Sequence, residues 1–249
     1  PNLPSKGLKE GPWVFERNGI YYLTFPHVEN KIERLEYAMG NSPMGPFKMT
    51  GVIMDESPLN CWTNHHSTIE KDGQWYLFYH QNEYSPKFDK NRSACIDSLF
   101  FNTDGTIQKV TPTFRGVGLT NATGKIEIDR YSGKSESGTF IALLDTVNTF
   151  SGWKANLEKP GAWIQYNSVD FGRKGLKSVR VNAFSKAGGT IEIRLNKTDG
   201  PVLARVKLRK GEVWQISKAK VAGSPRGVAN LVVISKSESP VLIDWMQFE

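Results

Sequence analysis

The sequence predicts an all-β protein of two domains: a partial β-propeller over residues 1–116, followed by a jelly-roll β-sandwich over residues 117–249. Three observations support this. Short aromatic or alternating runs are joined by Asn-Gly or Asp-Gly, which is typical of antiparallel hairpins. Two such hairpins share one plan and lie about 54 residues apart, as repeated small sheets do. Beyond residue 110, Val, Ile and Leu alternation replaces the aromatic hairpins, which favours a sandwich.

The first domain contains three predicted hairpins. "WVFERNGIYYLTFP" (13–26), "STIEKDGQWYLFYH" (67–80) and "SLFFNTDGTIQKV" (98–110) each place two strands around an Asn-Gly or Asp-Gly turn. Between the first two, "IERLEYAMGNSPMGPFKMTGVIM" (32–54) is expected to supply the outer strands of the first sheet. Small antiparallel sheets repeated in this way indicate propeller blades.

The second domain follows a change of composition. "TPTFRGVGLTNATG" (111–124) is rich in Pro, Gly and Thr and is expected to be a linker, with the domain boundary near residue 117. Strands are then predicted within 177–208, 229–236 and 241–249, separated by turn residues. This spacing of short strands is typical of a sandwich.

Composition narrows the function classes. The chain has 249 residues and a formal net charge of +7, and no apolar run approaches the ~20 residues of a membrane-spanning helix. Residues 1–116 carry a net charge of −1 and residues 117–249 a net charge of +8. The basic charges are scattered through strand-like sequence and no nucleic-acid-binding motif accompanies them, so neither a nucleic-acid nor a membrane partner is expected.

Two further features concern processing and redox state. The chain begins with Pro and shows no basic-then-apolar leader, which is expected of a processed or truncated product. The two cysteines, Cys61 and Cys95, are too few for a disulfide framework or a metal knuckle. They are interpreted as small core residues, or as a pair in an oxidising compartment.

"KEGPW" (9–13) opens a stretch that extends to Pro26 and resembles the general-acid segment of glycoside hydrolase family 43. Members of that family are five-bladed propellers that cleave xylans, arabinans and related side chains. The resemblance implies that Glu10 protonates the departing glycosidic oxygen. A general acid must hold its proton near neutral pH, which requires desolvation or a neighbouring carboxylate. We expect Trp13 to bind substrate and, with the Gly-Pro turn, to hold Glu10 at the mouth of a cavity with limited water.

Two later segments extend the resemblance over nearly all of residues 1–116. "WTNHHSTIEKDGQWYLFYHQ" (62–81) resembles the blade that carries an axial histidine, often close to a bound calcium, and the match is His65. Its neighbour His66 is expected to face the other side of the strand. "NRSACIDSLFFNTDGTI" (91–107) resembles the segment whose arginine reaches the sugar pocket, which implies that Arg92 binds substrate.

The general base is missing from this pattern. An inverting glycosidase needs a second carboxylate on the far side of the attacked bond, and in this family that aspartate precedes the acid segment, as does a third aspartate that tunes the acid. Only nine residues precede Glu10 and none is acidic. We therefore expect an N-terminal propeller portion on another polypeptide.

Residues 122–249 resemble carbohydrate-binding module family 6 through "KIEIDRYSG" (125–133), "GAWIQYNSVDFG" (161–172), "GGTIEIRLNKTDGPVLARVKL" (188–208), "GEVWQI" (211–216) and "VLIDWMQFE" (241–249). The resemblance implies a structural calcium held by Glu127, Asp129 and Asp244, whose oxygens suit that ion. It also implies sugar stacking on Trp214 and Trp163.

This module departs from its family at two places. Leu157 stands where an aromatic residue is usual, with Trp153 a possible replacement, and Leu242 stands where an asparagine is usual. Both changes put the usual loop site in doubt, and either tryptophan is alternatively a core residue.

Taken together, the segments predict a secreted or periplasmic glycosidase of the β-xylosidase or α-L-arabinofuranosidase type. Its partner would be plant cell-wall polysaccharide or oligosaccharide, its mechanism inverting and its cofactor calcium. The alternative is a non-catalytic carbohydrate-binding protein whose truncated propeller is inactive alone.

Overall fold

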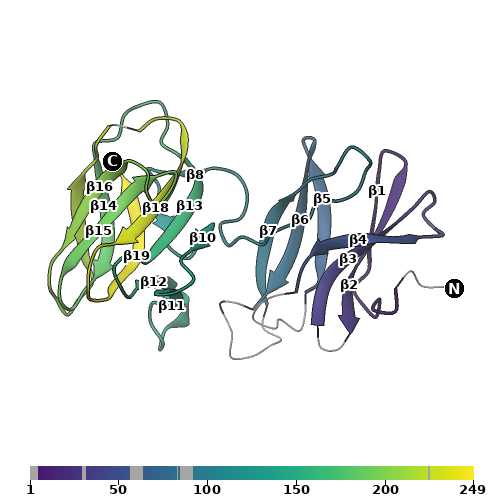
Figure 1. The fold of residues 1–249 in the computed structure, drawn as a ribbon, viewed down its shortest axis with the longest axis horizontal. Helices are drawn as coiled ribbons and strands as arrows, with labels where there is room; N and C mark the ends of the chain where they lie inside the picture. The colour runs from purple at the N-terminus through teal and green to yellow at the C-terminus, as the bar shows by residue number, and fades with distance from the viewer. Residues whose placement is uncertain (1–4, 30–31, 57–63, 83, 85–91, 224) are drawn as a thin grey trace. The chain divides into compact units, whose positions relative to one another are not determined.

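The computed structural model describes residues 5–29, 32–56, 64–82, 84, 92–223 and 225–249 (Figure 1). Within these ranges the secondary structure is strands and one short 3-10 helix, η1 (Thr149–Ser151), which confirms the all-β prediction. The chain divides into two compact units, residues 1–117 and 118–249, and each is described by itself. No helix in the described ranges has the length and apolar character that a membrane crossing needs.

The first sheet of the N-terminal unit contains four antiparallel strands in chain order. They are β1 (Trp13–Arg17), β2 (Ile20–Glu29), β3 (Ile32–Gly40) and β4 (Lys48–Met54). Asn18 and Gly19 join the first two with φ values of 53° and 78°. Such left-handed pairs match the twist of the flanking strands, so this hairpin forms as the Asn-Gly signal predicts.

The second sheet has three antiparallel strands, β5 (His66–Lys71), β6 (Gln74–Gln81) and β7 (Ser93–Leu99). Asp72 and Gly73 form its hairpin turn with positive φ values, as in the first sheet. The third predicted hairpin is shorter than expected, because Phe101 and Ile107 make only an isolated bridge around the turn at Gly105.

A shared apolar core joins the two sheets of this unit. Tyr22 and Leu35 from the first sheet and Leu77 and Leu99 from the second are all at most 1% exposed in one cluster. Phe15 stacks on Tyr22 with ring centroids 4.7 Å apart. Small antiparallel sheets packed face to face through apolar side chains are the arrangement of propeller blades, and the unit is a partial propeller.

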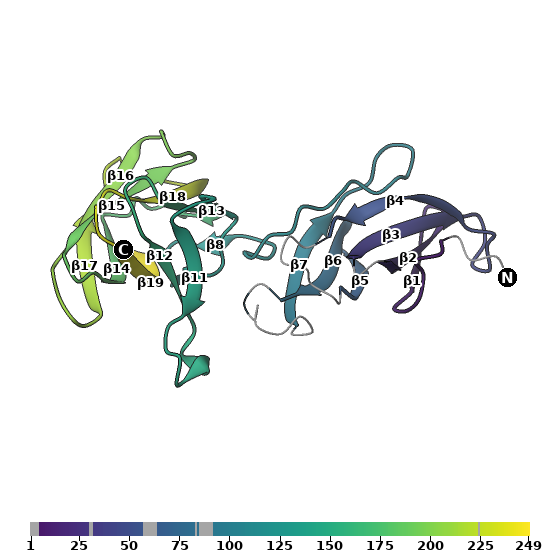
Figure 2. The same ribbon diagram turned by 60° about the horizontal axis from the view of Figure 1, so that its bottom comes forward.

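The C-terminal unit is a β-sandwich of two sheets (Figure 2). One has the order β10-β13-β18-β15-β16 with β8 on β13, and the other the order β11-β12-β19-β14-β17 with β9 on β19. The strands are β8 (Thr120–Asn121), β9 (Ile126–Glu127), β10 (Gly133–Lys134), β11 (Thr139–Leu143), β12 (Trp153–Leu157), β13 (Trp163–Asp170), β14 (Ser178–Phe184), β15 (Gly189–Leu195), β16 (Val202–Leu208), β17 (Gln215–Lys220), β18 (Val228–Ser235) and β19 (Val241–Phe248).

Strand alternation places the sandwich core. Along β14, Val179, Val181 and Ala183 are at most 3% exposed, whereas the residues between them are half-buried. A period of two is expected of a strand with one face on the core. The core therefore lies between the two sheets, and the polar residues of β14 face outward.

The segment predicted as a linker is partly built into the two units. The Thr113 backbone N–H and hydroxyl both donate to the Asp97 carboxylate of β7, at 2.9 and 2.6 Å. Farther on, Thr120 and Asn121 form β8, which pairs in parallel with β13. The prediction that all of residues 111–124 form a linker is thus wrong toward both ends of the segment. Thr113 is hydrogen-bonded to β7, and Thr120 and Asn121 pair with β13.

Candidate functional site

Glu10, Glu33 and His65 gather at one place in the N-terminal unit. One ligand atom from each, a carboxylate oxygen or an imidazole nitrogen, lies within 4.8 Å of the other two. The described part of the chain holds no other group of three His, Cys, Asp or Glu residues this close. Glu10 precedes β1, Glu33 lies on β3 and His65 precedes β5, so strands of both sheets position the cluster.

Glu10 and His65 are in direct contact. The His65 Nε2 atom lies 3.7 Å from Glu10 Oε1, and the two side chains are 39% and 55% exposed. The structure thus brings together two of the predicted site residues. The sequence predicts that Glu10 lies at the mouth of a cavity with limited water. Among the described residues, its side chain is more exposed to solvent than this prediction implies.

Gly11 makes this contact possible. Its φ of +59° lies in the left-handed region that favours glycine. A Cβ atom at this position would lie 3.1 Å from the His65 ring and 3.2 Å from the Pro26 ring. The Gly-Pro turn after Glu10 therefore leaves the space that the imidazole occupies.

Trp13, three residues after Glu10, is held in place by hydrogen bonds to both sheets. Its indole N–H donates to Thr68 Oγ1 at 3.0 Å, and its carbonyl oxygen accepts from Thr24 Oγ1 at the same distance. The side chain remains 40% exposed. A fixed aromatic ring with an open face is suited to stacking on a sugar.

His66 and His80 are half-buried residues that lie next to the cluster. His66 Nε2 lies 2.7 Å from Thr24 Oγ1, and burial, with the charge of His65, lowers the pKa of His66 to about 4. His80 Nε2 accepts from the His65 backbone N–H at 3.1 Å. Burial, with the charges of Arg92 and His65, lowers the pKa of His80 to about 4, so His80 is a neutral acceptor at physiological pH. His80 was not singled out from the sequence.

Glu33 is the second carboxyl group of the site and was also missed from the sequence. It is 2% exposed, and its Oε1 accepts from the Asn64 backbone N–H at 2.8 Å. Its Oε2 is buried without a hydrogen-bond partner in the described structure. Burial, together with the charge of Glu10, raises the pKa of Glu33 to about 7, against opposing effects of Asn64 and Arg92.

Strand parity was the available signal for Glu33. It lies two and four residues before Leu35 and Tyr37 on β3, and both are core residues with at most 2% exposure. Residues at this spacing share one face of a strand. A glutamate on the buried face of a strand is expensive unless paired, which marks it as unusual.

Arg92 lies near enough to act on this site electrostatically. Its charge lowers the pKa of both Glu33 and His80. Arg92 itself is exposed at the start of the described segment that leads into β7. Cys61, which was interpreted as a core residue or a disulfide partner, lies outside the described residues.

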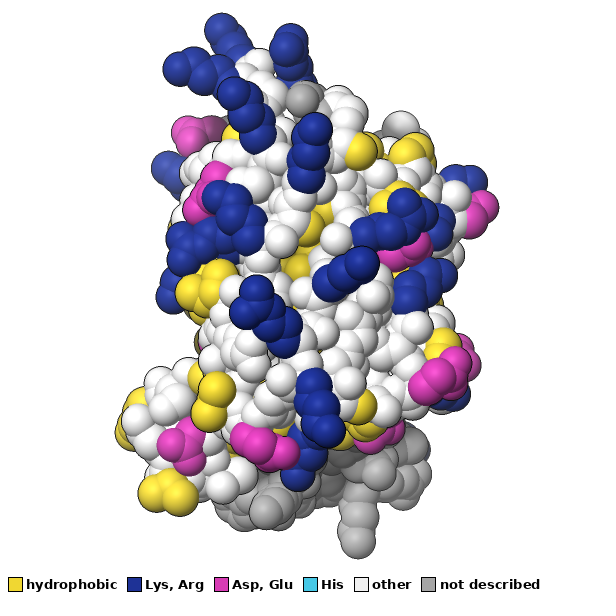
Figure 3. Space-filling model, turned by 90° about the vertical axis from the view of Figure 1, so that its left-hand side faces the viewer, with side chains coloured by type: hydrophobic (Ala, Val, Ile, Leu, Met, Phe, Trp, Pro, Cys, Tyr) yellow, Lys and Arg dark blue, Asp and Glu magenta, His cyan; other side chains and the backbone are white. Residues whose placement is uncertain are grey.

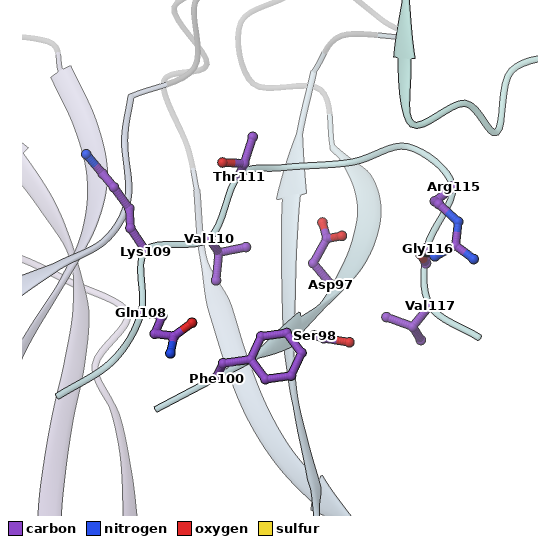
Figure 4. A pocket seen from close by; sticks show the side chains of 10 residues that line it. All are labelled: Asp97, Ser98, Phe100, Gln108, Lys109, Val110, Thr111, Arg115, Gly116 and Val117. Atoms are coloured by element: carbon purple, nitrogen blue, oxygen red, sulfur yellow. Dashed lines mark hydrogen bonds between the residues drawn. The ribbon is translucent and has the colours of Figure 1, made fainter. Parts of the chain in front are cut away.

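A separate cavity of about 260 Å³ lies against β7 (Figure 4). None of the predicted site residues lines it. Asp97 faces it but is occupied, because its carboxylate accepts hydrogen bonds from the Tyr79 hydroxyl at 2.7 Å and from Thr113. Asp97 therefore fastens the segment after residue 110 to the second sheet.

The two predicted stacking tryptophans of the sandwich are each half-buried. The Trp214 ring packs against Phe184 with centroids 6.0 Å apart. Trp163 begins β13 and covers Gly133, where a Cβ atom would lie 3.7 Å from its ring. Leu157, in the place of the usual aromatic residue, is fully buried and belongs to the core.

Asp244 acts electrostatically on the other two predicted calcium ligands of the sandwich, Glu127 and Asp129. Burial and the charges of Asp244 and Asp129 raise the pKa of Glu127. Burial is also the main cause that raises the pKa of Asp129, with a contribution from Asp244. Asp244 Oδ2 accepts from Asn182 Nδ2 at 2.8 Å. In the described residues these carboxylates are not as tightly gathered as Glu10, Glu33 and His65.

Comparisons with known proteins match the two units separately. Residues 3–107 match the model of glycosyl hydrolases family 43, and residues 131–249 match the carbohydrate binding module of family 6. An arabinoxylan arabinofuranohydrolase of Bacillus subtilis (strain 168) is 27% identical over 246 residues, which cover 86% of this chain and 47% of that protein. A beta-xylosidase of Xylanibacter ruminicola is 37% identical over 101 residues, or 41% of this chain and 30% of that protein.

A solved structure shows the same fold. The family 43 arabinoxylan arabinofuranohydrolase from Bacillus subtilis in complex with cellotetraose aligns with a TM-score of 0.57 and 24% identity, covering 97% of this chain and 54% of that one. The chain spans about half the length of the arabinoxylan arabinofuranohydrolases that it matches. The chain thus joins part of a glycosyl hydrolase family 43 domain, residues 3–107, to a carbohydrate-binding module of family 6, residues 131–249.

Proposed function

We propose that this chain takes part in the inverting hydrolysis of xylose- or arabinose-containing plant polysaccharides or oligosaccharides, with Glu10 as the general acid. The single observation that carries the proposal is the cluster of Glu10, Glu33 and His65, with the exposed ring of Trp13 three residues after Glu10. The substrate class is supported by the names of the relatives, which include an arabinoxylan arabinofuranohydrolase and a beta-xylosidase.

The chemistry requires two carboxyl groups. The Glu10 carboxyl donates its proton to the glycosidic oxygen as the bond from that oxygen to the anomeric carbon breaks. Water attacks the anomeric carbon from the opposite face and gives a proton to a carboxylate base, so the configuration inverts. That base lies roughly 6.5–9.5 Å from the acid in inverting enzymes. We propose that a further polypeptide segment, an N-terminal propeller portion, supplies it.

The neighbouring residues have separate roles in this proposal. Trp13 would stack on a sugar ring, since its ring is fixed by Thr68 and open on one face. The Arg92 guanidinium would donate to sugar hydroxyls. His65, in contact with Glu10, would orient the carboxyl toward the leaving oxygen.

Calcium fits two places in the chain. At the cluster, the buried Glu33 Oε2 has no partner among the described residues, and carboxylate oxygens are the donors that calcium prefers. Glu33, Glu10 and His65 would border a cation there, which would offset the repulsion between the two carboxylates. In the sandwich, β9 pairs with β19, and the backbone N–H of Ile128, between Glu127 and Asp129, donates to the Asp244 carbonyl oxygen at 3.1 Å. This arrangement, with burial and the charge of Asp244, which raise the pKa of Glu127 and of Asp129, supports a structural ion held by these three residues.

The sandwich would hold the chain on its polymeric substrate. Trp163 and Trp214 are half-buried aromatic residues whose remaining exposed surface would stack on sugar rings. Because such polymers occur outside cells, the protein would work in a secreted or periplasmic location.

Hydrolysis is tested with arabinoxylan and with aryl xylosides and arabinofuranosides. The 249-residue chain is assayed alone and after co-expression with the proposed N-terminal propeller portion, and proton NMR follows the anomer released first. We expect activity only in the combination, with the inverted anomer as first product. Binding of arabinoxylan without hydrolysis in both preparations would instead support a non-catalytic binding protein.

A further inference from the structure

A basic groove runs between the two open edges of the sandwich. β16 is the edge strand of one sheet and β17 the edge strand of the other. The two edges meet where the Ala222 backbone N–H donates to the Leu203 carbonyl oxygen at 2.8 Å. Between them lies a groove of about 400 Å³, which we call the edge groove.

Apolar and cationic residues share the lining of the edge groove. Val202, Leu203, Ala204, Ala219 and Ala222 supply the small apolar part. Arg205 and Lys207 from β16 and Lys218 and Lys220 from β17 supply four cations, all on exposed residues. None of the residues that line it is acidic.

Strand geometry arranges these cations in two rows. Arg205 and Lys207 are two residues apart on β16, as are Lys218 and Lys220 on β17. Alternate residues of a strand share a face and are spaced by about 7 Å. The groove therefore presents positive charge repeatedly along its length, as a polymer that carries spaced negative groups requires.

Two of the four cations have no carboxylate of their own. Arg205 Nε lies 2.9 Å from Glu192 Oε1, and Lys218 Nζ lies 2.7 Å from Glu249 Oε2. No ion pair joins Lys207 or Lys220 to any carboxylate among the described residues. The face of the sandwich in Figure 3 likewise shows many more Lys and Arg side chains than Asp and Glu side chains.

We propose that the edge groove binds the carboxylate groups of a uronate-bearing polysaccharide. The argument is charge complementarity, in a unit that belongs to a family of carbohydrate-binding modules and carries most of the positive charge of the chain. A glycan is favoured over nucleic acid because residues 131–249 match a carbohydrate-binding module, whereas their sequence carries no nucleic-acid-binding motif. The edge groove is separate from Trp163 and Trp214, which do not line it.

The test compares two forms of one polysaccharide. Binding of the 249-residue chain to glucuronoxylan, and to the same glucuronoxylan with its carboxyl groups reduced to alcohols, is measured by titration calorimetry at low and high salt. We expect the acidic form to bind about tenfold more tightly at low salt and the difference to shrink as salt screens the charges. Equal affinity for the two forms would overturn the proposal.

Matched charge variants locate the site. Lys207→Gln with Lys220→Gln removes the two unpaired cations of the groove, and Lys174→Gln with Lys186→Gln removes two exposed lysines outside its lining. We expect the first double variant to lose about tenfold in affinity for glucuronoxylan and the second less than about twofold. Both variants change the net charge equally, so a difference between them reports the position of the charges.

Three outcomes would contradict the groove as a uronate site. The first is an equal loss of affinity in the two double variants. The second is an unchanged affinity of the Lys207→Gln, Lys220→Gln variant together with its self-association, which would mean that the lysines only protect the strand edges. The third is groove-dependent binding of a single-stranded DNA oligonucleotide without binding of glucuronoxylan. Thermal unfolding of each variant checks that the fold is kept. Hydrolysis is measured separately, with Glu10 variants. The proposed uronate site and the proposed glycosidase activity can therefore fail independently of one another.

Discussion

His65 Nε2 lies 3.7 Å from Glu10 Oε1, and the glycine that follows Glu10 leaves room for the imidazole ring. This contact crosses from the segment before β1 to the segment before β5, so it depends on the packing of two sheets. The orientation of the Glu10 carboxyl group therefore depends on how the two sheets of the N-terminal unit pack together.

Gly11→Ala tests that contact, with Gly19→Ala as its control. Both glycines have left-handed φ values, so each alanine costs about 1 kcal/mol of unfolding free energy from backbone strain. A Cβ atom at Gly11 would crowd His65, whereas one at Gly19 would meet nothing within 4 Å. We expect similar losses of stability by chemical denaturation, but only Gly11→Ala should shift the His65 imidazole resonances. Equal shifts in both would show that His65 does not depend on the turn.

Variants of Trp13 distinguish the effect of its hydrogen bond on stability from the effect of its ring on sugar binding. Trp13→Phe and Thr68→Val each remove the 3.0 Å bond, and each should lower the unfolding free energy by about 1 kcal/mol. Trp13→Phe keeps an aromatic face, so oligosaccharide binding by the active preparation should fall less than about threefold, whereas Trp13→Ala should weaken it more than about tenfold. Equal binding by the phenylalanine and alanine variants would argue against stacking.

Glu33 should make stability depend on pH. Its folded-state pKa of about 7 lies above the ordinary 4.5, so the folded state holds this proton more tightly than the unfolded state. The contribution of this proton to the free energy of unfolding, about 3 kcal/mol in total, is fully present below about pH 4.5 and is lost as pH rises through 7. Glu33→Gln should therefore match the wild type at pH 4 and exceed its stability at pH 8.5, measured by denaturation with EDTA present.

A control and a contrary result define this prediction. The same comparison with Glu70→Gln, at an exposed residue of β5 whose carboxylate accepts from the Gly73 backbone N–H, should not show a gain in stability at pH 8.5. If Glu33→Gln changes stability by the same amount at pH 4 and pH 8.5, the carboxyl does not titrate in this range.

The two tryptophans of the sandwich can be ranked by arabinoxylan binding. Trp163→Ala and Trp214→Ala are compared with Phe150→Ala, which removes a 98% exposed aromatic ring from η1 in the β11–β12 connection. We expect at least one tryptophan variant to lose about tenfold in affinity by affinity electrophoresis and the phenylalanine variant to lose little. Unchanged binding in both tryptophan variants would assign both rings to packing.

Local sequence signals predicted the hairpins and the two-part architecture. Asn18-Gly19 and Asp72-Gly73 form their turns through local backbone preference. The carboxylates of Glu16 and Glu70, three residues before the glycines, accept from the glycine N–H groups, so a short window of sequence is enough. The segment after residue 110 was misread because Pro, Gly and Thr suggest a linker, whereas the partner of Thr113 is Asp97, 16 residues away.

The site was predictable only in part for a similar reason. Glu10 and His65 stand in short motifs, but Glu33 and His80 join them through bonds to the backbone of Asn64 and His65. Such partners become neighbours only when the two sheets pack. Leu157 is the converse case, because a departure from the family pattern proved to be a fully buried core residue.

The central claim is that Glu10 is the general acid, and its dependence on the leaving group is the most direct test. In the active preparation, Glu10→Gln is compared with the wild type on arabinoxylan and on a 2,4-dinitrophenyl glycoside, whose leaving group needs no proton. The account predicts that kcat/KM falls about 10³-fold or more on arabinoxylan but less than about tenfold on the activated glycoside. Equal losses on both substrates, or full activity of Glu10→Gln on arabinoxylan, would contradict it.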